Sequence, residues 1–325
     1  MNENSVVNIA GYKFEPLENP VDLVRMCQQK CDELKLKGTM LISKNGINFS
    51  LAGTKQATDT IIAFLEEDSR FLNIPLKVTY SETQPFRRMK VRQKKEIISL
   101  GRKDINPREL TGERISPQEL KNLLDNKEDV LVLDTRNEYE TRVGKFENAI
   151  ELNLDTFRDF PEAIESLPEE YKDKQIVMYC TGGIRCEKAS AYFKYKGFEN
   201  VYQLEGGIIE YTRQVKAQGL DNKFRGKNFV FDQRRAEQIS DEVIAVCHQC
   251  GTPCDTHINC ANEACHLLFI QCPTCAEAHN SCCSDHCSVV VQLPEDQQKR
   301  LRKGTKNSNK IFKKGRSETL AFMKK

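Results

Sequence analysis

The amino-acid sequence predicts an α/β protein built from three unlike parts, and three observations carry this prediction. The first hundred residues alternate strand-like and helix-like runs in the order βαββαβ. The central part has short apolar β-runs separated by helical patterns, which is typical of a parallel α/β sheet. Ten of the fourteen cysteines and all five histidines lie between Cys247 and Cys287, which indicates a small metal-binding module.

Length and composition exclude several classes of protein. A chain of 325 residues is too long for one small domain, and a hydrophobic content of 39% with interspersed charge suits a folded protein. The sequence contains no run of 18 apolar residues, so it predicts no transmembrane helix. Its first residues do not follow the pattern of a secretory signal. We therefore expect a cytoplasmic protein with no membrane partner, in which clustered cysteines bind metal or catalyse.

The net charge of +2 hides a strong segregation along the chain. Residues 299–325 contain eleven Lys or Arg and one acidic residue, so their net charge is +10 and that of the remaining chain is −8. A run of like charges is usually only a solvated segment. Because the rest of the chain is acidic, this basic tail could also bind RNA without sequence specificity. We expect deletion of residues 299–325 to weaken RNA binding and to flatten its dependence on salt.

Local signals define the elements of the first part. Val6–Phe14 has the pattern of a strand, and Pro20–Leu36 places apolar residues along one helical face. Asn45-Gly46 predicts a hairpin turn between two strands, because both positions must tolerate positive φ. Thr54 can cap a second helix, and Ile74–Tyr80 is expected as the closing strand. This order of elements is that of a ferredoxin-like unit.

A basic stretch follows this closing strand. Residues 86–95 hold six basic side chains and no acidic one, and Met89 and Val91 alternate with lysine and arginine. A strand with one cationic face would favour a phosphate backbone through counterion release. The same pattern also fits a solvated edge strand, where lysine blocks aggregation. The candidate RNA contacts are Arg87, Arg88, Lys90, Arg92, Lys94 and Lys95.

The central part is expected after a polar linker. Ser116-Pro117-Gln118-Glu119 has the composition of a capping box with proline at the first helical position, so a helix should run to about Asn126. Apolar runs at residues 130–133 and 176–179 are expected as parallel strands, and the second leads directly into Cys180.

The loop from Cys180 to Arg185 carries the chemistry of this part. A cysteine at the carboxyl end of a parallel strand lies where open α/β sheets place their sites. Gly182 and Gly183 should let the backbone curl so that its N–H groups point inward, and a helix of about residues 185–196 should direct its N-terminal dipole to the same centre. Both effects favour the Cys180 thiolate as a nucleophile, with Arg185 as a fixed positive charge. Cys186 could resolve an oxidised Cys180 as a disulfide, although a small residue packed under the loop is the preferred interpretation.

These residues resemble the rhodanese-like family of sulfurtransferases over about residues 118–216. The marks are the loop Cys180-Thr181-Gly182-Gly183-Ile184-Arg185, the motif Asp134-Thr135-Arg136 and the later Gly206-Gly207. A six-residue loop is the sulfur-transfer length, so the resemblance implies a persulfide on Cys180, held by the loop amides, and disfavours phosphatase activity. One departure is Lys145-Phe146 after Gly144, where a histidine is common in the family; it does not touch the loop.

Over roughly residues 5–275 the chain resembles a narrower family, the rhodanese-containing tRNA uridine(34) hydroxylases. Its marks are the Asn45-Gly46 hairpin, the stretch 86–91, the extended loop 180–188 and residues 226–234. The resemblance implies formation of 5-hydroxyuridine at the wobble position of tRNA, with molecular oxygen as co-substrate and the position of Cys180 essential. No flavin or nicotinamide motif is evident, and with every histidine in the Cys-rich segment the first 246 residues cannot build a two-His-one-carboxylate iron site.

The Cys-rich segment has the spacing of paired zinc knuckles. Cys247-x2-Cys250 and Cys272-x2-Cys275 would form one tetrahedral site, and an interleaved second site would use the following residues, with the choice between Cys282 and Cys283 open: Cys260, Cys265, Cys283 and Cys287. Some forty residues cannot bury a sufficient core, so a structural zinc would supply folding energy. An iron–sulfur cluster is the rival, and it would make the protein brown.

The expected organisation is a ferredoxin-like domain at 1–100, a linker at 101–117, a rhodanese-like domain at 118–218, a connecting segment at 219–243, a metal-binding module at 244–290 and a basic tail at 291–325. The preferred function is tRNA wobble-uridine hydroxylation. The alternatives are a sulfurtransferase or persulfide carrier, served by a sulfur donor protein, and a non-catalytic RNA-binding adaptor. Nothing indicates DNA as a partner.

Overall fold

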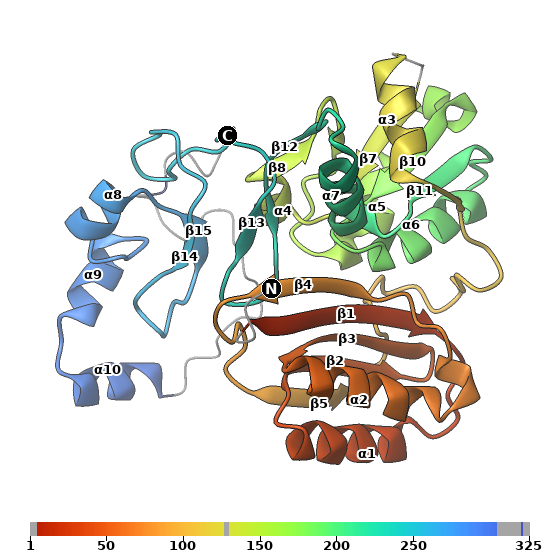
Figure 1. Ribbon diagram of the computed structural model, residues 1–325. Helices are drawn as coiled ribbons and strands as arrows, with labels where there is room; N and C mark the ends of the chain where they lie inside the picture. Colours follow the sequence, from red (N-terminus) through yellow and green to blue (C-terminus); the bar gives the residue numbers. More distant parts are fainter. Residues whose placement is uncertain (1–4, 127–129, 304–319, 321–325) are drawn as a thin grey trace. The chain divides into compact units, whose positions relative to one another are not determined.

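The computed structural model describes residues 5–126, 130–303 and residue 320 (Figure 1). The chain divides into two compact units, each of which is assembled from separate stretches of sequence. Unit 1 comprises residues 1–136, 157–221 and 230–234. Unit 2 comprises residues 137–156, 222–229 and 235–325.

Unit 1 contains the expected ferredoxin-like domain. Its strands are β1 (Val6–Phe14), β2 (Lys37–Ser43), β3 (Gly46–Gly53), β4 (Lys77–Ser81) and β5 (Met89–Gln93). They lie in the order β4-β1-β3-β2-β5, and every pair is antiparallel except β2 with β5. The helices α1 (Pro20–Glu33) and α2 (Lys55–Glu66) share one apolar core with the sheet (Figure 1). The βαββαβ order and the fold class are therefore confirmed.

Two boundaries in this domain differ from the expectation for local reasons. The first helix ends at Glu33 instead of Leu36, because Lys35 takes a left-handed φ of 54° that no helix can continue. The closing strand begins at Lys77 instead of Ile74, because Pro75 has no N–H to donate to a sheet ladder. Thr54 caps α2 as expected, and its side chain accepts a hydrogen bond from the Ala57 N–H.

The basic stretch forms the edge strand β5. Met89 and Val91 pack against the core of the domain, and the alternate residues Lys90 and Arg92 therefore face the opposite way. Of the six basic residues only Lys90 is partly buried, and none forms an ion pair with a described acidic residue. The strand thus presents the cationic face that the alternation predicts, at the edge of its sheet.

The second part of unit 1 is a parallel sheet flanked by helices. Its strands β6 (Glu113–Ile115), β11 (Val201–Leu204), β10 (Gln175–Tyr179) and β7 (Val130–Asp134) are neighbours in that order. The helices that follow or precede these strands are α3 (Pro117–Asp125), α5 (Phe160–Glu165), α6 (Ile184–Tyr195) and α7 (Gly207–Gln218). Short 3-10 turns occupy Phe157–Asp159 and Glu169–Asp173, and a further one, Ser69–Phe71, lies in the first domain.

The start of this sheet shows where local signals succeed and fail. The capping box is complete: Ser116 accepts from the Glu119 N–H, and the Glu119 carboxylate accepts from the Ser116 N–H. Strand β6 lies inside the segment that is expected to be a linker. The sequence does not predict this strand, because only Ile115 of its three residues is buried and an apolar pattern is absent.

Unit 2 contains a small antiparallel sheet and the Cys-rich module. The sheet has the order β13 (Ala236–Gln238), β12 (Phe224–Phe229), β8 (Gly144–Phe146), so the expected connecting segment 219–243 contributes two strands. Gly144 must be glycine, because a Cβ there would lie 2.2 Å from the Lys227 carbonyl oxygen. The other elements of the unit are α4 (Glu138–Thr141), β9 (Ile150–Glu151), β14 (His257–Asn259), β15 (Leu268–Ile270), α8 (Pro273–Ala278), α9 (Asp285–Val291) and α10 (Glu295–Arg302).

The Cys-rich module does not stand alone, which modifies the expectation of a forty-residue domain without a core. Leu267 and Phe269 belong to the same buried cluster as Tyr139, Val143 and Phe229. Residues from three stretches of sequence thus share one apolar interior, although eight of the ten cysteines still gather in two groups within it.

The basic tail is described only in part. It begins in helix α10, and Leu320 is buried in the core of unit 2. The rest of the predicted RNA-binding tail, residues 304–319 and 321–325, lies outside the described residues. Among the described residues no helix has the length and apolar character that would cross a membrane.

Candidate functional site

The residue with the strongest chemical signal, Cys180, directly follows strand β10. Its side chain is almost completely buried, and helix α6 begins four residues later, at Ile184. The carboxyl end of a parallel strand and the N-terminus of a helix therefore meet at the sulfur, as the sequence predicts.

Backbone amides surround the Cys180 sulfur. The Gly183 N–H donates to Cys180 Sγ at 3.1 Å, and the amides of Gly182 and Arg185 act on the same sulfur. Burial alone would raise the pKa of Cys180, but a hydrogen bond from Cys186, the charge of Arg185 and these amides together lower it to about 5. The thiol is therefore a thiolate at neutral pH.

Two glycines shape this loop, and only one of them, Gly183, belongs to the pair Gly182-Gly183 that the sequence predicts will curl the backbone. Gly183 has a φ of 96°, as expected, and a Cβ at this position would meet the Tyr12 hydroxyl at 3.0 Å. Gly182 has no positive φ and open space around its Cα, so its role is limited to its amide. Gly207 at the start of α7 is the second constrained position, because a Cβ there would lie 2.4 Å from the Cys180 carbonyl oxygen.

Cys186 lies beneath the thiolate. It is fully buried, hydrogen-bonds with Cys180, and its sulfur is 3.7 Å from the Thr135 hydroxyl. Burial, reinforced by the neighbouring Cys180, raises the pKa of Cys186 well above its usual value. Cys186 therefore keeps its proton and donates a hydrogen bond to the Cys180 thiolate, which fits the packed interpretation while leaving the two sulfurs adjacent.

Arg185 and Thr181 complete the loop. Arg185 is 6% exposed, and its guanidinium lies 3.4 Å from the Thr181 hydroxyl. The guanidinium carbon also lies 5.9 Å from the centroid of the Phe231 ring. Phe231 has no local signal in the sequence that would connect it with this loop.

A buried ion pair supports the loop from the neighbouring strand. Asp134 ends β7 and binds Arg136 with both carboxylate oxygens, at 2.9 and 2.7 Å, and both side chains are fully buried. The Arg136 guanidinium also lies 5.6 Å from the ring of Tyr179, which directly precedes Cys180. The Asp-x-Arg motif is thus a structural brace next to the site.

A second network connects the ferredoxin-like domain to the cysteine loop within unit 1. Glu187, on the first turn of α6, accepts from the Tyr12 hydroxyl at 3.0 Å and from the Arg114 guanidinium at 2.6 Å. Thr111 and Gln203 donate to its other oxygen at 3.1 and 3.2 Å. Burial, followed by the charges of Glu187 and Cys180, raises the pKa of Tyr12, so this hydroxyl stays protonated. Sequence reasoning missed this network because hydrogen-bonded partners in it lie up to 175 positions apart.

Lys77 brings a further positive charge from the same domain. Its ammonium lies 4.6 Å from the centroid of the Tyr12 ring. Burial lowers the pKa of Lys77, against an opposing influence of the negative charges on Cys180 and Glu187. Lys77 forms no ion pair with a described residue. Its positive charge interacts with the negative charge of the Cys180 thiolate.

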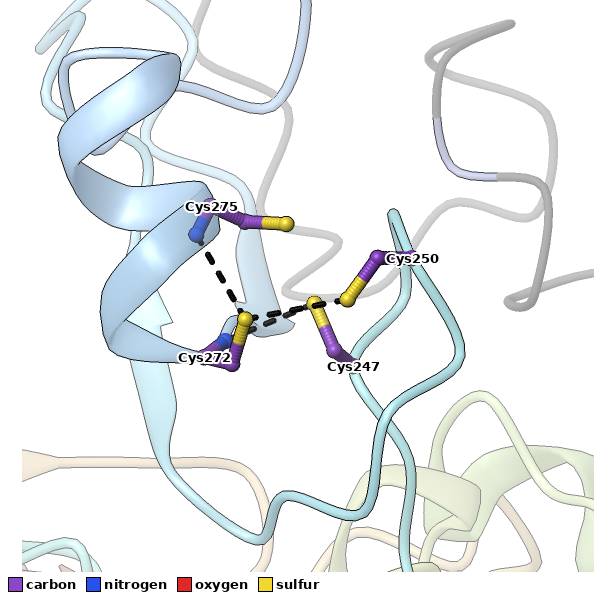
Figure 2. Close-up of side chains that lie close together, drawn as sticks. All are labelled: Cys247, Cys250, Cys272 and Cys275. Carbon is purple, nitrogen blue, oxygen red and sulfur yellow. Dashed lines mark hydrogen bonds between the residues drawn. The ribbon is translucent and has the colours of Figure 1, made fainter.

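The first group of cysteines lies in unit 2 (Figure 2). Cys247 and Cys250 come from a loop, Cys272 and Cys275 from the start of α8, and the four sulfurs lie within 4.8 Å of one another. The N–H groups of Cys272 and Cys275 donate to Cys247 Sγ and Cys272 Sγ, both at 3.4 Å. Four convergent thiols with amide donors suit a soft tetrahedral ion such as Zn²⁺.

The second group has the same character. Its sulfurs also lie within 4.8 Å of one another and belong to Cys260, Cys265, Cys283 and Cys287. Cys282 is not a member, because its thiol is directed to the Asn280 carbonyl oxygen at 3.3 Å. No histidine belongs to either group among the described residues: His248 accepts from the Ile270 N–H, and His257 packs edge-on against Phe229. Both groups could hold a metal ion.

Comparison with known protein families matches three parts of the chain. Residues 6–97 match the "UPF0176 acylphosphatase like domain", residues 116–214 the "Rhodanese-like domain" and residues 225–288 the "Rhodanase C-terminal" family. A rhodanese-like domain protein from Staphylococcus aureus, whose structure is solved, is 27% identical, with a TM-score of 0.27, over 30% of this chain and 90% of that chain.

Curated relatives match almost the whole chain. A protein of Photorhabdus laumondii named "tRNA uridine(34) hydroxylase" is 46% identical over 95% of this chain and 88% of its own length. A protein of the same name from Pectobacterium carotovorum is 45% identical over 95% of this chain and 87% of its own length. Identity at this level over nearly the full length of both sequences places the chain in the tRNA uridine(34) hydroxylase family.

Proposed function

We propose that this protein hydroxylates uridine at position 34 of tRNA and that Cys180 is its reactive group. The observation that carries the proposal is the thiolate of Cys180, held by loop amides and Arg185, in a chain about 45% identical to proteins with that activity in their name. A buried cysteine without a chemical role would gain nothing from a pKa near 5.

Each residue of the loop has a definite part in this proposal. The amides of Gly182 and Gly183 and the guanidinium of Arg185 hold the negative charge on sulfur, and Cys186 contributes a hydrogen bond. The loop therefore suits either a bare thiolate or a persulfide, whose outer sulfur would carry the charge. Molecular oxygen is the proposed co-substrate of the hydroxylation.

Two further features support a tRNA substrate and a structural metal. The six cations in and beside β5, five of which are exposed, would bind the phosphate backbone, as expected for the residues between Arg87 and Lys95. Two zinc ions in the cysteine groups would fix the fold of unit 2, since each group offers four sulfurs and no position for a substrate.

Sulfur transfer is the second candidate function, and the same thiolate favours it. A low-pKa cysteine in an amide loop can take sulfur from a donor protein and pass it to an acceptor. Transfer of sulfur from thiosulfate to cyanide by the pure protein, without any change in tRNA nucleosides, would support this alternative. An RNA-binding adaptor would instead tolerate the loss of the Cys180 thiol.

Mass spectrometry of tRNA nucleosides from a deletion strain tests the proposal. We expect 5-hydroxyuridine derivatives to disappear on deletion, to return with the wild-type gene and to remain absent with Cys180→Ala. Cys254→Ala is the matched control, because Cys254 is also buried but lies outside the loop and both cysteine groups. Unchanged nucleosides in the deletion strain would falsify the hydroxylase function, and rescue by Cys180→Ala would remove the cysteine from the mechanism.

A further inference from the structure

Phe231 is an exposed aromatic ring beside the reactive loop. It keeps 59% of its surface exposed, more than any other phenylalanine or tyrosine in the described part of the chain. It belongs to residues 230–234, the short stretch that returns to unit 1 between two segments of unit 2. Its ring lies 5.9 Å from the guanidinium carbon of Arg185.

The three residues that follow Phe231 are held by hydrogen bonds. Asp232 binds Arg234 with both carboxylate oxygens, at 3.0 and 2.6 Å, and also accepts from the Arg234 N–H. Gln233, which lies between Asp232 and Arg234, donates its N–H to the Pro85 carbonyl oxygen at 3.0 Å. The exposure of Phe231 is therefore a fixed feature of a braced loop.

Arg185 links this ring to the chemistry. The Arg185 guanidinium lowers the pKa of Cys180 and also faces the Phe231 ring. Arg185 therefore interacts with both the thiolate and the aromatic ring. A planar group stacked on Phe231 would lie beside the Arg185 guanidinium, whose charge acts on the Cys180 sulfur. Uracil is such a group, and proteins that recognise single-stranded RNA stack unpaired bases on aromatic rings and on arginine.

We propose that Phe231 is the stacking platform for the pyrimidine base on which Cys180 acts. The inference rests on the proposed function and extends it by naming the residue that holds the base. Phe231 acts by binding the ring of uracil, with Arg185 at its edge. The contribution of Phe231 to binding is separate from that of the β5 cations, because the phenyl ring contacts the base and the cations contact only the phosphates.

Binding of two anticodon stem-loops measures this directly. One carries uridine at position 34 and the other an abasic ribose at the same position, so their affinity ratio isolates the contribution of the base. Stacking on an aromatic residue corresponds to an affinity ratio of about 5 to 150. We expect the wild-type protein to show a ratio in this range, and Phe231→Leu to reduce it to about 1 while binding the abasic RNA unchanged.

Tyr195→Leu is the matched control. Tyr195 is 54% exposed and has the Arg102 guanidinium 5.6 Å from its ring centroid, but it lies at the far end of α6. Phe231→Tyr keeps the ring and should keep the ratio. The pH midpoint of Cys180 alkylation in Phe231→Leu reports whether the loop is intact.

The outcomes separate the inference from the function on which it rests. An unchanged ratio in Phe231→Leu, in a protein whose wild type produces 5-hydroxyuridine in cells, overturns the platform and leaves the hydroxylase standing. A ratio lost in Phe231→Leu and kept in Tyr195→Leu supports the platform even if the wild type produces no 5-hydroxyuridine. Equal loss in both variants shows a general effect of exposed rings and also overturns it.

Discussion

At the scale of single residues, the state of Cys180 is decided by a competition between burial and local charge. Burial disfavours the thiolate, and the hydrogen bond from Cys186, the Arg185 charge and the loop amides reverse that preference. The sequence is sufficient to predict Cys180, Gly183 and Arg185, because they are contiguous and their loop follows an apolar strand. Tyr12, Lys77 and Phe231 could not be predicted, because they reach the loop only through long-range folding.

The pH dependence of Cys180 alkylation tests this balance. The rate should rise with pH around a midpoint of about 5, because only the thiolate reacts, and it should be nearly constant above neutral pH. Arg185→Gln removes an attractive charge and should move the midpoint up by about 1 to 3 pH units. The measurement is iodoacetamide labelling of the intact protein at a series of pH values.

A control at the other end of the same helix makes the test specific. Lys194→Gln also removes one positive charge from α6, but from its last turn. Its midpoint should stay within a few tenths of the wild-type value, since screening and distance weaken the interaction. A midpoint that moves equally in both variants would mean that net charge, and not the position of Arg185, sets the pKa.

The hydrogen bond between Tyr12 and Glu187 should contribute to stability. Tyr12→Phe removes one donor from a buried carboxylate that keeps three other partners, so we expect the free energy of unfolding to fall by about 1–2 kcal/mol. Chemical denaturation measures this loss. In a double-mutant cycle with Glu187→Gln the two effects should be clearly non-additive, and simple additivity would argue against the bond.

At the scale of elements, predictions succeed where a few neighbouring residues define a structure. The Ser116 capping box and the Thr54 cap are such signals, and both helices begin where expected. Strands β6 and β12 have no comparable signal, because β6 pairs with the distant β11 and β12 with the distant β8, and β13 has none because it is only three residues long. The edge strand β5 is intermediate: its alternation is local, but its place beside β2 is not.

The cations of β5 should contribute to the salt dependence of tRNA binding. Lys90→Gln combined with Arg92→Gln should lower the slope of log K against log salt by about 2, because each substitution leaves one phosphate without its neutralising cation. The control Lys55→Gln removes an exposed cation of α2 that is paired with Asp59 in the same domain, and it should leave the slope unchanged. A slope unaffected by the β5 substitutions would assign the strand the purely protective role of a solvated edge.

At the scale of the whole molecule, metal ions should determine whether unit 2 is folded. We expect two zinc ions per chain in elemental analysis and a colourless protein. Cys265→Ser should reduce the content to about one, and removal of both ions by a chelator should expose apolar residues of the unit 2 core, such as Phe269, to a hydrophobic dye.

Cys254→Ser separates ligand loss from the general effect of changing a buried cysteine. Cys254 lies in the same module and is 8% exposed, but belongs to neither group. This variant should retain two ions. A brown protein with iron and acid-labile sulfide would instead show that a cluster occupies one of the groups.

The interleaving of the two units has a consequence for how this protein could have evolved. The chain passes between units at residues 136/137, 156/157, 221/222, 229/230 and 234/235. A fragment ending at residue 221 would keep β8 and lose its partner β12, which would uncover the buried rings of Phe146 and its neighbours. Loss of residues 235–325 at a single point would remove the whole cysteine-rich part, but it would also uncover Tyr139, Val143 and Phe229, which share its apolar core. The cysteine-rich part is therefore joined to the chain at one point but depends for its core on residues almost a hundred positions upstream.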